Sequence, residues 1–285
     1  MDIGVCLPTT VPGVDGRQLI EFARDADRLG FASLTVIDRV VYDNYDGIVA
    51  LSAAAAVTER IGLTTAILLA AARPSAVELA KQAASLDRLS GGRLTLGVSA
   101  GMREEDYVAT GTEHATRGER LDRMIEEMRE IWRGEGPVPG VGPRPARGDI
   151  PIWGGGHSAA GLRRAARYGI GWISPGGPPH RFPDLVKAVK ELWAEEGRAG
   201  VPRMGANCYV SLGPGGRERA TEHMLGYYSF MGPMAERLAA GAVCDESGLR
   251  DTVDAYAANG CDELFLLPVT ADPDHLGRVA TVVLG

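Results

Sequence analysis

Short apolar runs alternate with longer amphipathic stretches along this chain of 285 residues. Runs of four to eight apolar residues are typical of strands that are buried on both faces, while the longer stretches repeat their apolar residues at helical spacing. In the first long stretch, Leu19, Ala23 and Ala26 recur on one helical face, and Gly30 is suited to end the helix. A regular alternation of strands and helices predicts a parallel sheet covered by helices.

Eight stretches have the strand pattern and ten have the helix pattern. Eight strands on one alternating pattern predict a (β/α)8 TIM barrel that residues 1–285 form as a single α/β domain. A doubly wound open sheet is the structural alternative. The predicted strands cover residues 2–7, 33–37, 63–69, 93–98, 150–153, 170–174, 204–212 and 263–267. The predicted helices cover residues 16–29, 47–58, 75–89, 117–132, 159–168, 183–197, 217–228, 234–240, 247–259 and 273–284.

Charge and composition narrow the classes of partner. A formal net charge of -7 argues against a nucleic acid or an anionic membrane as the main partner. The N-terminus has no signal-peptide pattern, and no apolar run reaches the roughly 20 residues of a membrane span, so we expect a cytoplasmic protein. Four scattered cysteines have no metal-ligand spacing and are interpreted as reduced thiols, so no metal is expected; they are Cys6, Cys208, Cys244 and Cys261.

Five segments resemble the luciferase-like superfamily, which includes bacterial luciferase, FMN-dependent monooxygenases and F420-dependent reductases. They occur in the order of that family and together span most of the chain. The most specific is residues 86–101, Leu-Asp-Arg-Leu-Ser-Gly-Gly-Arg-Leu-Thr-Leu-Gly-Val-Ser-Ala-Gly. The others are residues 26–39, 61–81, 151–158 and 260–264. This resemblance implies a single barrel that holds a flavin or deazaflavin at the C-terminal ends of its strands.

A glycine-rich segment follows the predicted fifth strand and precedes a helix. Backbone without Cβ approaches an anion closely, and the first N–H groups of a helix attract negative charge. The resemblance implies that this is the phosphate-binding segment, with Ser158 and the N–H groups of Gly155 and Gly156 as the main candidates. The alternative is a plain flexible turn. The segment consists of Gly154, Gly155, Gly156, His157 and Ser158.

Two further segments match positions at which relatives contact the cofactor ring. Residues Thr65, Ala66 and Ile67 align with a non-prolyl cis peptide, expected here at Thr65–Ala66 or Ala66–Ile67; an ordinary buried strand is the alternative. After the fourth strand, the small residues Ala100 and Gly101, with Met102, are suited to contact a flat ring or ribityl chain. Bacterial luciferase has, at the position of Ala100, an arginine that contacts the phosphate. This chain lacks that arginine, and its small residues here resemble those of the F420-dependent branch.

Asp38 and Arg39 end the predicted second strand and are the candidate catalytic residues, together with His114 in the loop after the fourth strand. Many relatives have Asp-His where this chain has Asp38 and Arg39. An arginine keeps its proton near neutral pH and therefore does not act as a general acid. Arg39 either binds negative charge on the substrate or reduced ring, or forms a surface salt bridge with Asp38 or Asp43.

The resemblance and these residues favour an F420-dependent oxidoreductase that moves a hydride between the deazaflavin C5 and a small organic substrate. The first alternative is an FMN-dependent monooxygenase that takes reduced flavin from a partner reductase and activates oxygen. The second alternative is a non-catalytic flavin-binding barrel. The resemblance also implies a homodimer formed through early helices, for which the apolar segment 48–57 is suited.

Overall fold

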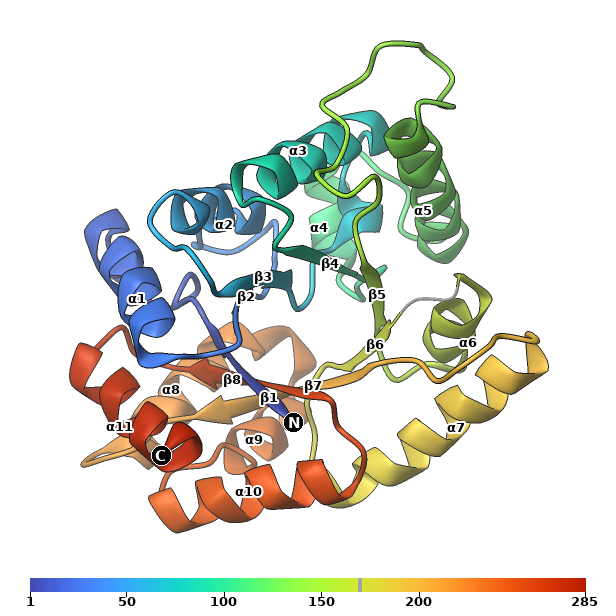
Figure 1. Ribbon diagram of the computed structural model, residues 1–285. Helices are drawn as coiled ribbons and strands as arrows, with labels where there is room; N and C mark the ends of the chain where they lie inside the picture. The colour runs from blue at the N-terminus through green and yellow to red at the C-terminus, as the bar shows by residue number, and fades with distance from the viewer. Residues whose placement is uncertain (169–170) are drawn as a thin grey trace.

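Eight parallel strands close into a barrel in the order of the chain. The computed structural model describes residues 1–168 and 171–285, and in Figure 1 the strands form the centre of the molecule. Strand β8 returns to β1, where Ile3 pairs with Leu264 and Val5 pairs with Leu266. This closure confirms the predicted (β/α)8 barrel and rules out an open sheet, which would keep two unpaired edges. The strands are β1 (Asp2–Cys6), β2 (Ser33–Val36), β3 (Gly62–Thr65), β4 (Leu94–Val98), β5 (Ile152–Gly155), β6 (Gly171–Ser174), β7 (Met204–Val210) and β8 (Glu263–Pro268).

Helices surround the barrel, and local signals in the sequence set several of their ends. Helix α1 begins with a capping box between Asp15 and Gln18 and ends at Gly30, which has a left-handed φ of 95°. Helix α4 lies in the loop after the fourth strand, where the sequence pattern predicted no element. The helices are α1 (Gly16–Leu29), α2 (Gly47–Ala55), α3 (Ala76–Leu89), α4 (Glu104–Thr110), α5 (Arg117–Arg133), α6 (Ala159–Tyr168), α7 (Phe182–Glu195), α8 (Gly216–Tyr227), α9 (Pro233–Ala240), α10 (Glu246–Ala258) and α11 (Pro273–Leu284), with 3-10 turns η1 (Ala70–Ala72), η2 (Pro179–Arg181) and η3 (Ser229–Met231).

Two predicted strand boundaries near the site are wrong. The third strand ends at Thr65 instead of residue 69, and the chain passes from there into η1. The fifth strand runs from Ile152 to Gly155 because Gly155 still pairs with Ile173 of β6. Gly154 and Gly155 therefore belong to the barrel wall and not to the connecting turn. Of the predicted sixth strand, residues 171–174 are confirmed and residue 170 lies outside the described residues.

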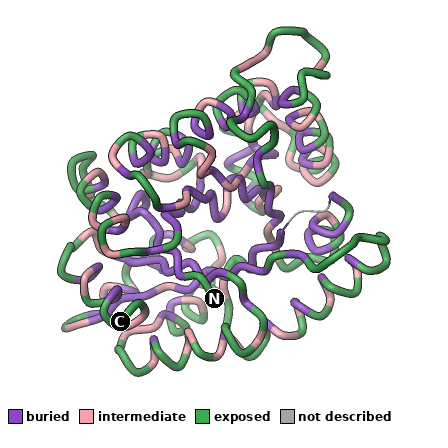
Figure 2. Tube along the Cα trace, viewed as in Figure 1, coloured by how far each residue is buried: buried purple, intermediate pink, exposed green. Residues whose placement is uncertain are grey.

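The buried apolar residues form two main layers, and a third, smaller cluster joins α8 and α9. The larger cluster fills the space between the barrel and its helices, and a smaller one fills the barrel interior toward its mouth. Figure 2 shows this as a buried central ring inside helices whose outer faces are exposed. The inner cluster includes Ile37, Ala66, Trp153, Ile173 and Phe265, all of which follow or lie within strands. The floor of the barrel mouth is therefore apolar and closely packed.

Helix α2 buries most of its apolar surface inside the protein. Ile48, Leu51, Ala54 and Ala55 are buried, and Val49, with 65% of its surface exposed, is the large apolar side chain that this helix leaves to solvent. The proposed dimer face is thus smaller than the sequence pattern indicates, and the homodimer stays a prediction. Among residues 1–168 and 171–285, no helix has both the length and the apolar composition required to cross a membrane.

Candidate functional site

The segment after β3 forms one wall of the barrel mouth. Its Ala66–Ile67 peptide bond is cis, the second of the two positions predicted. The Ala66 carbonyl accepts a hydrogen bond of 2.8 Å from Asn207 Nδ2. Thr65 and Ala66 are fully buried, and the Thr65 hydroxyl donates to the Gly97 carbonyl at 2.7 Å. Of the three residues predicted to contact a cofactor here, only Ile67 has a partly exposed side chain, so Thr65 and Ala66 position it.

Asn207 is a buried polar residue that the sequence analysis missed. It lies within the apolar strand β7 and is 5% exposed, and its Oδ1 atom has no hydrogen-bond partner. A lone amide in the middle of a buried strand is a recognisable signal, because burying an amide is unfavourable unless its hydrogen bonds are formed. Here one half of the amide holds the Ala66 carbonyl, and the other half is buried without a hydrogen-bond partner.

Glycines give the mouth its close backbone approaches. A Cβ on Gly155 would lie 1.6 Å from Ile67 Cδ1, and a Cβ on Gly101 would lie 2.9 Å from Leu69 Cδ2. Gly101 also has a φ of 70°, which favours glycine. The neighbouring Ala100 carbonyl accepts a hydrogen bond from the Tyr107 hydroxyl. The small-residue segment predicted after the fourth strand is thus a fixed part of the rim, while Met102 is 62% exposed and points away from this packing.

Asp38 is a positioning residue and not a free acid. Its carboxylate accepts hydrogen bonds from the Leu69 N–H at 2.9 Å and from Arg73 Nη2 at 3.0 Å, and only 1% of its side chain is exposed. Burial raises the pKa of this carboxyl, and the Arg73 guanidinium opposes the rise. With both oxygens occupied, Asp38 connects the end of β2 to the segment after β3 instead of contacting a ligand.

Arg39 lies over the inner cluster, surrounded by aromatic rings. It is 9% exposed, and its guanidinium carbon is 4.3 Å from the centre of the Tyr42 ring, 4.9 Å from that of Tyr227 and 5.4 Å from that of Phe230. It donates to the backbone carbonyls of Tyr227 and Val41. Within the described residues no carboxylate lies within salt-bridge distance of it. The alternative interpretation of Arg39, a surface salt bridge with Asp38 or Asp43, is therefore wrong, because the Asp38 carboxylate pairs with Arg73 and Arg39 is enclosed by aromatic rings.

A groove opens beside Arg39. It has a volume of about 610 Å³ and lies between the segment after β2, helix α4 and η3. Arg103 lies in its wall, with its guanidinium carbon 4.7 Å from the centre of the Phe230 ring. The residues that line the groove are Val41, Met102, Arg103, Glu104, Glu105, Val108, Ala109 and Phe230. Of these, the sequence analysis had named Met102.

The phosphate segment keeps its predicted place between strand and helix, but its free N–H groups differ from those expected. Gly155 belongs to β5, and the Gly156 N–H donates to the Ile173 carbonyl at 3.4 Å, so neither glycine is a free donor of the predicted kind. Ser158 caps α6, since its Oγ accepts from the Gly161 N–H at 3.1 Å. The N–H groups that the helix geometry leaves available in the first turn are those of Ala159 and Ala160.

Histidines lie beside the mouth at two places. His157 Nε2 is 2.9 Å from Ser174 Oγ, and burial, followed by the charge of Arg181, lowers the pKa of His157. His114 packs edge-on against Tyr107, with 5.1 Å between the ring centres. Tyr107 in turn donates to the Ala100 carbonyl, so His114 packs against a residue that contacts the rim, and its catalytic role stays a prediction.

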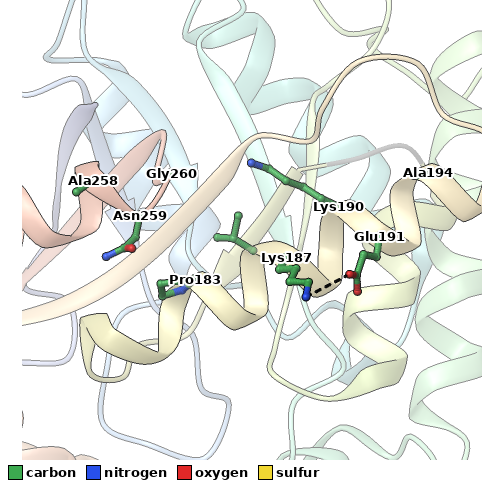
Figure 3. A pocket seen from close by; sticks show the side chains of 9 residues that line it. Pro183, Lys187, Lys190, Glu191, Ala194, Ala258, Asn259 and Gly260 are labelled. Carbon is green, nitrogen blue, oxygen red and sulfur yellow. Dashed lines mark ion pairs between the residues drawn. The ribbon is translucent and has the colours of Figure 1, made fainter.

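A second groove, of about 650 Å³, lies in the outer helical layer (Figure 3). All of its lining residues belong to α7, to the end of α10 or to the turn after it. Lys187 and Glu191 pair along α7 at 3.8 Å, as the dashed line in Figure 3 shows. No residue of this groove comes from a loop that follows a strand, so it is separate from the barrel mouth.

Comparison with known proteins supports the same family over almost the whole length. The family model for luciferase-like monooxygenases matches residues 1–283. The uncharacterized protein Rv0940c of Mycobacterium tuberculosis (strain ATCC 25618 / H37Rv) is 34% identical over 211 residues, which cover 63% of this chain and 72% of that protein.

Two solved structures share the fold. The monooxygenase RslO1 from Streptomyces bottropensis superposes with a TM-score of 0.81 at 21% identity, covering 99% of this chain and 97% of that one. An F420-dependent secondary alcohol dehydrogenase, solved with an F420–acetone adduct, superposes with a TM-score of 0.79 at 17% identity, covering 99% and 98%. Because the family model spans the closed barrel and all the segments at its mouth, this chain belongs to the luciferase-like monooxygenase family.

Proposed function

We propose that this protein is an F420-dependent oxidoreductase that transfers a hydride between the deazaflavin C5 and a small organic substrate. The observation that carries the choice of F420 over FMN is the rim at Ala100 and Gly101. The Ala100 carbonyl is bound by Tyr107, and the methyl side chain offers no cation to a flavin phosphate. This matches the small residues of the F420-dependent branch and departs from the arginine of bacterial luciferase.

The residues at the mouth fit a flat tricyclic ring. Ile67 presents a partly exposed apolar surface, and Gly155 and Gly101 leave the space that Ile67 and Leu69 occupy. Behind Ile67, Asn207 Nδ2 holds the Ala66 carbonyl of the cis peptide bond and so fixes this wall. At the other end, the first turn of α6 offers the Ala159 and Ala160 N–H groups to a phosphate.

The cofactor, when bound, supplies the hydride chemistry, and the protein supplies binding and orientation. The apolar inner cluster excludes water from one face of the ring. Arg39 keeps its proton near neutral pH, so it stabilises negative charge without transferring a proton. The proton that accompanies the hydride therefore moves through the substrate or solvent, and not through residue 39.

Direct titration tests the choice of cofactor. Purified protein is titrated with F420 and, separately, with FMN while binding is followed by fluorescence or calorimetry. We expect micromolar or tighter binding of F420 and at least tenfold weaker binding of FMN. Micromolar binding of FMN without binding of F420 would contradict the proposal and favour the FMN-dependent monooxygenase. Binding of neither cofactor would contradict both enzyme assignments. Oxidation of F420H2 with a panel of carbonyl and enone substrates then measures catalysis.

A further inference from the structure

Two guanidinium groups converge beside the barrel mouth: Arg103 lines the groove, and Arg39 contacts two of its lining residues, Val41 and Phe230. Arg39 Nη2 donates to the Val41 carbonyl at 3.1 Å, and Arg103 Nη1 lies 3.5 Å from the same oxygen. Both guanidinium groups also contact the Phe230 ring. Each of these arginines is 9% exposed, and the Nε atom of each is buried without a hydrogen-bond partner. Two like charges share one neutral acceptor here, so an anion between them would be stabilised by both.

The carboxylates nearby leave Arg39 uncompensated. Glu105 contacts Arg103, but 64% of the Glu105 side chain is exposed and its charge is screened by water. Asp106 lies 4.0 Å from Arg103 Nε and is fully buried, and its Oδ1 accepts the N–H groups of Val40 and Val41. Among the residues that the structure describes, no carboxylate is within 4.0 Å of Arg39. A buried guanidinium that meets only carbonyls and aromatic rings is a receptor for a carboxylate or another oxyanion.

The groove that leads outward from these arginines exposes large apolar side chains on its walls. Val108 is 74% exposed, Met102 is 62% exposed and Phe230 is 38% exposed, which is unusual for such side chains unless they meet a partner. Glu104 and Glu105 are the acidic groups in the lining. An occupant with one anionic end and one apolar end matches this distribution, with its anionic end at Arg39 and its tail along helix α4.

We propose that the substrate is an amphipathic carboxylate, whose carboxylate binds between Arg39 and Arg103 and whose hydrocarbon tail lies along Met102, Val108 and Phe230. This inference rests on the proposed function for the position of the reacting cofactor, but the anion site itself is tested without the cofactor. The role of Arg39 would then be recognition of the substrate, in place of the histidine that many relatives have there.

Calorimetric titration with octanoate and with octanamide tests the charge requirement. The two probes have the same chain and differ in the charge of the head group. We expect octanoate to bind at least tenfold more tightly than octanamide, because a charge-assisted hydrogen bond is much stronger than a neutral one. We expect this preference to disappear in Arg39→Gln and Arg103→Gln and to persist in the control Arg24→Gln, which changes an exposed arginine of α1. Equal binding of the two probes by the unaltered protein would overturn the proposal.

A second pair of variants remains informative if the buried arginines are needed for folding. Val108 is exposed on the groove wall, so Val108→Asp and Val108→Lys change its charge without disturbing the core. Either charge would stand against the apolar tail, so we expect Val108→Asp and Val108→Lys each to weaken the binding of octanoate and of octanamide about tenfold. Unchanged octanoate affinity in both variants would show that the tail does not follow α4 and would overturn the proposed position.

Titration of the same variants with F420 separates this proposal from the assignment of the cofactor. If Arg39→Gln weakens F420 binding tenfold and leaves octanoate binding unchanged, the arginine pair belongs to the cofactor and the proposed substrate class is wrong. If the unaltered protein binds octanoate selectively but does not bind F420, the anion site stands and the proposed function is wrong.

Discussion

The first turn of α6 provides a direct test of where the cofactor phosphate binds. Ala159 is exposed at the first helical position, directly after the cap Ser158. In Ala159→Asp, a carboxylate would stand beside the N–H groups that we expect to meet the phosphate. An acidic residue in the first turn stabilises a helix by about 0.3–1 kcal/mol, so the folded state is not weakened. The change therefore perturbs binding and not folding.

The expected loss of affinity follows from Coulomb's law. Two unit charges about 4 Å apart repel by about 1 kcal/mol in bulk water and by about 4 kcal/mol near a protein surface. These energies correspond to roughly fivefold and roughly thousandfold weaker binding. Ala159→Asn is the matched control, because asparagine has nearly the same shape as aspartate and carries no charge. We expect Ala159→Asp to weaken cofactor binding at least fivefold relative to Ala159→Asn.

Fluorescence titration at low and high ionic strength is the assay. Repulsion between exposed charges is screened by salt, so we expect the difference between the two variants to shrink as the salt concentration rises. The same dissociation constant for both variants at low salt would refute the assignment of the phosphate to α6. A loss of affinity in Ala159→Asn alone would point to shape and not to charge.

Three further predictions concern stability. Asp38→Asn should lower the free energy of unfolding by about 3 kcal/mol in urea titrations, because it leaves the Arg73 guanidinium without its buried partner. Asp46, whose side chain is 37% exposed, pairs with the same guanidinium at 2.7 Å, so Asp46→Asn should cost less than about 1 kcal/mol; equal losses would contradict this. Gly155→Val should lower the free energy of unfolding by about 2 kcal/mol, because the new side chain would overlap with Ile67, and adding Ile67→Ala should recover part of that loss. Additive losses in the double variant would contradict the overlap. Burial lowers the pKa of His275 to about 4 from an unfolded value near 6.5, so this residue binds fewer protons when folded, and its contribution to the free energy of unfolding is present above pH 6.5 and lost as the pH falls toward 4. At pH 5 the free energy of unfolding should therefore be about 2 kcal/mol lower than at neutral pH, and His275→Gln should remove this difference. An unchanged pH dependence in that variant would exclude His275 as its source.

Periodicity in the sequence was sufficient to predict the barrel. Strands buried on both faces must be continuously apolar, and covering helices must be apolar on one face, so both patterns are present in the residues themselves. The ordered motifs likewise indicated the family and the segments at the mouth. Strand ends were less predictable, because Gly154 and Gly155 have no strand preference and join β5 through pairing with the neighbouring strands β4 and β6.

The directions of the polar side chains at the mouth were decided by tertiary structure. The sequence places Asp38 beside Arg39, and a local interpretation pairs them, but the fold turns Asp38 outward to Arg73 and Arg39 inward to aromatic rings. One ring is that of Tyr42, close to Arg39 in the chain. The other is that of Tyr227 at the end of α8, nearly 190 residues from Arg39. Sequence alone thus determined which chemical groups the chain possesses and which fold would carry them. Only closure of the barrel, which brings distant loops to one rim, decided which of those groups are paired and which remain available for a ligand.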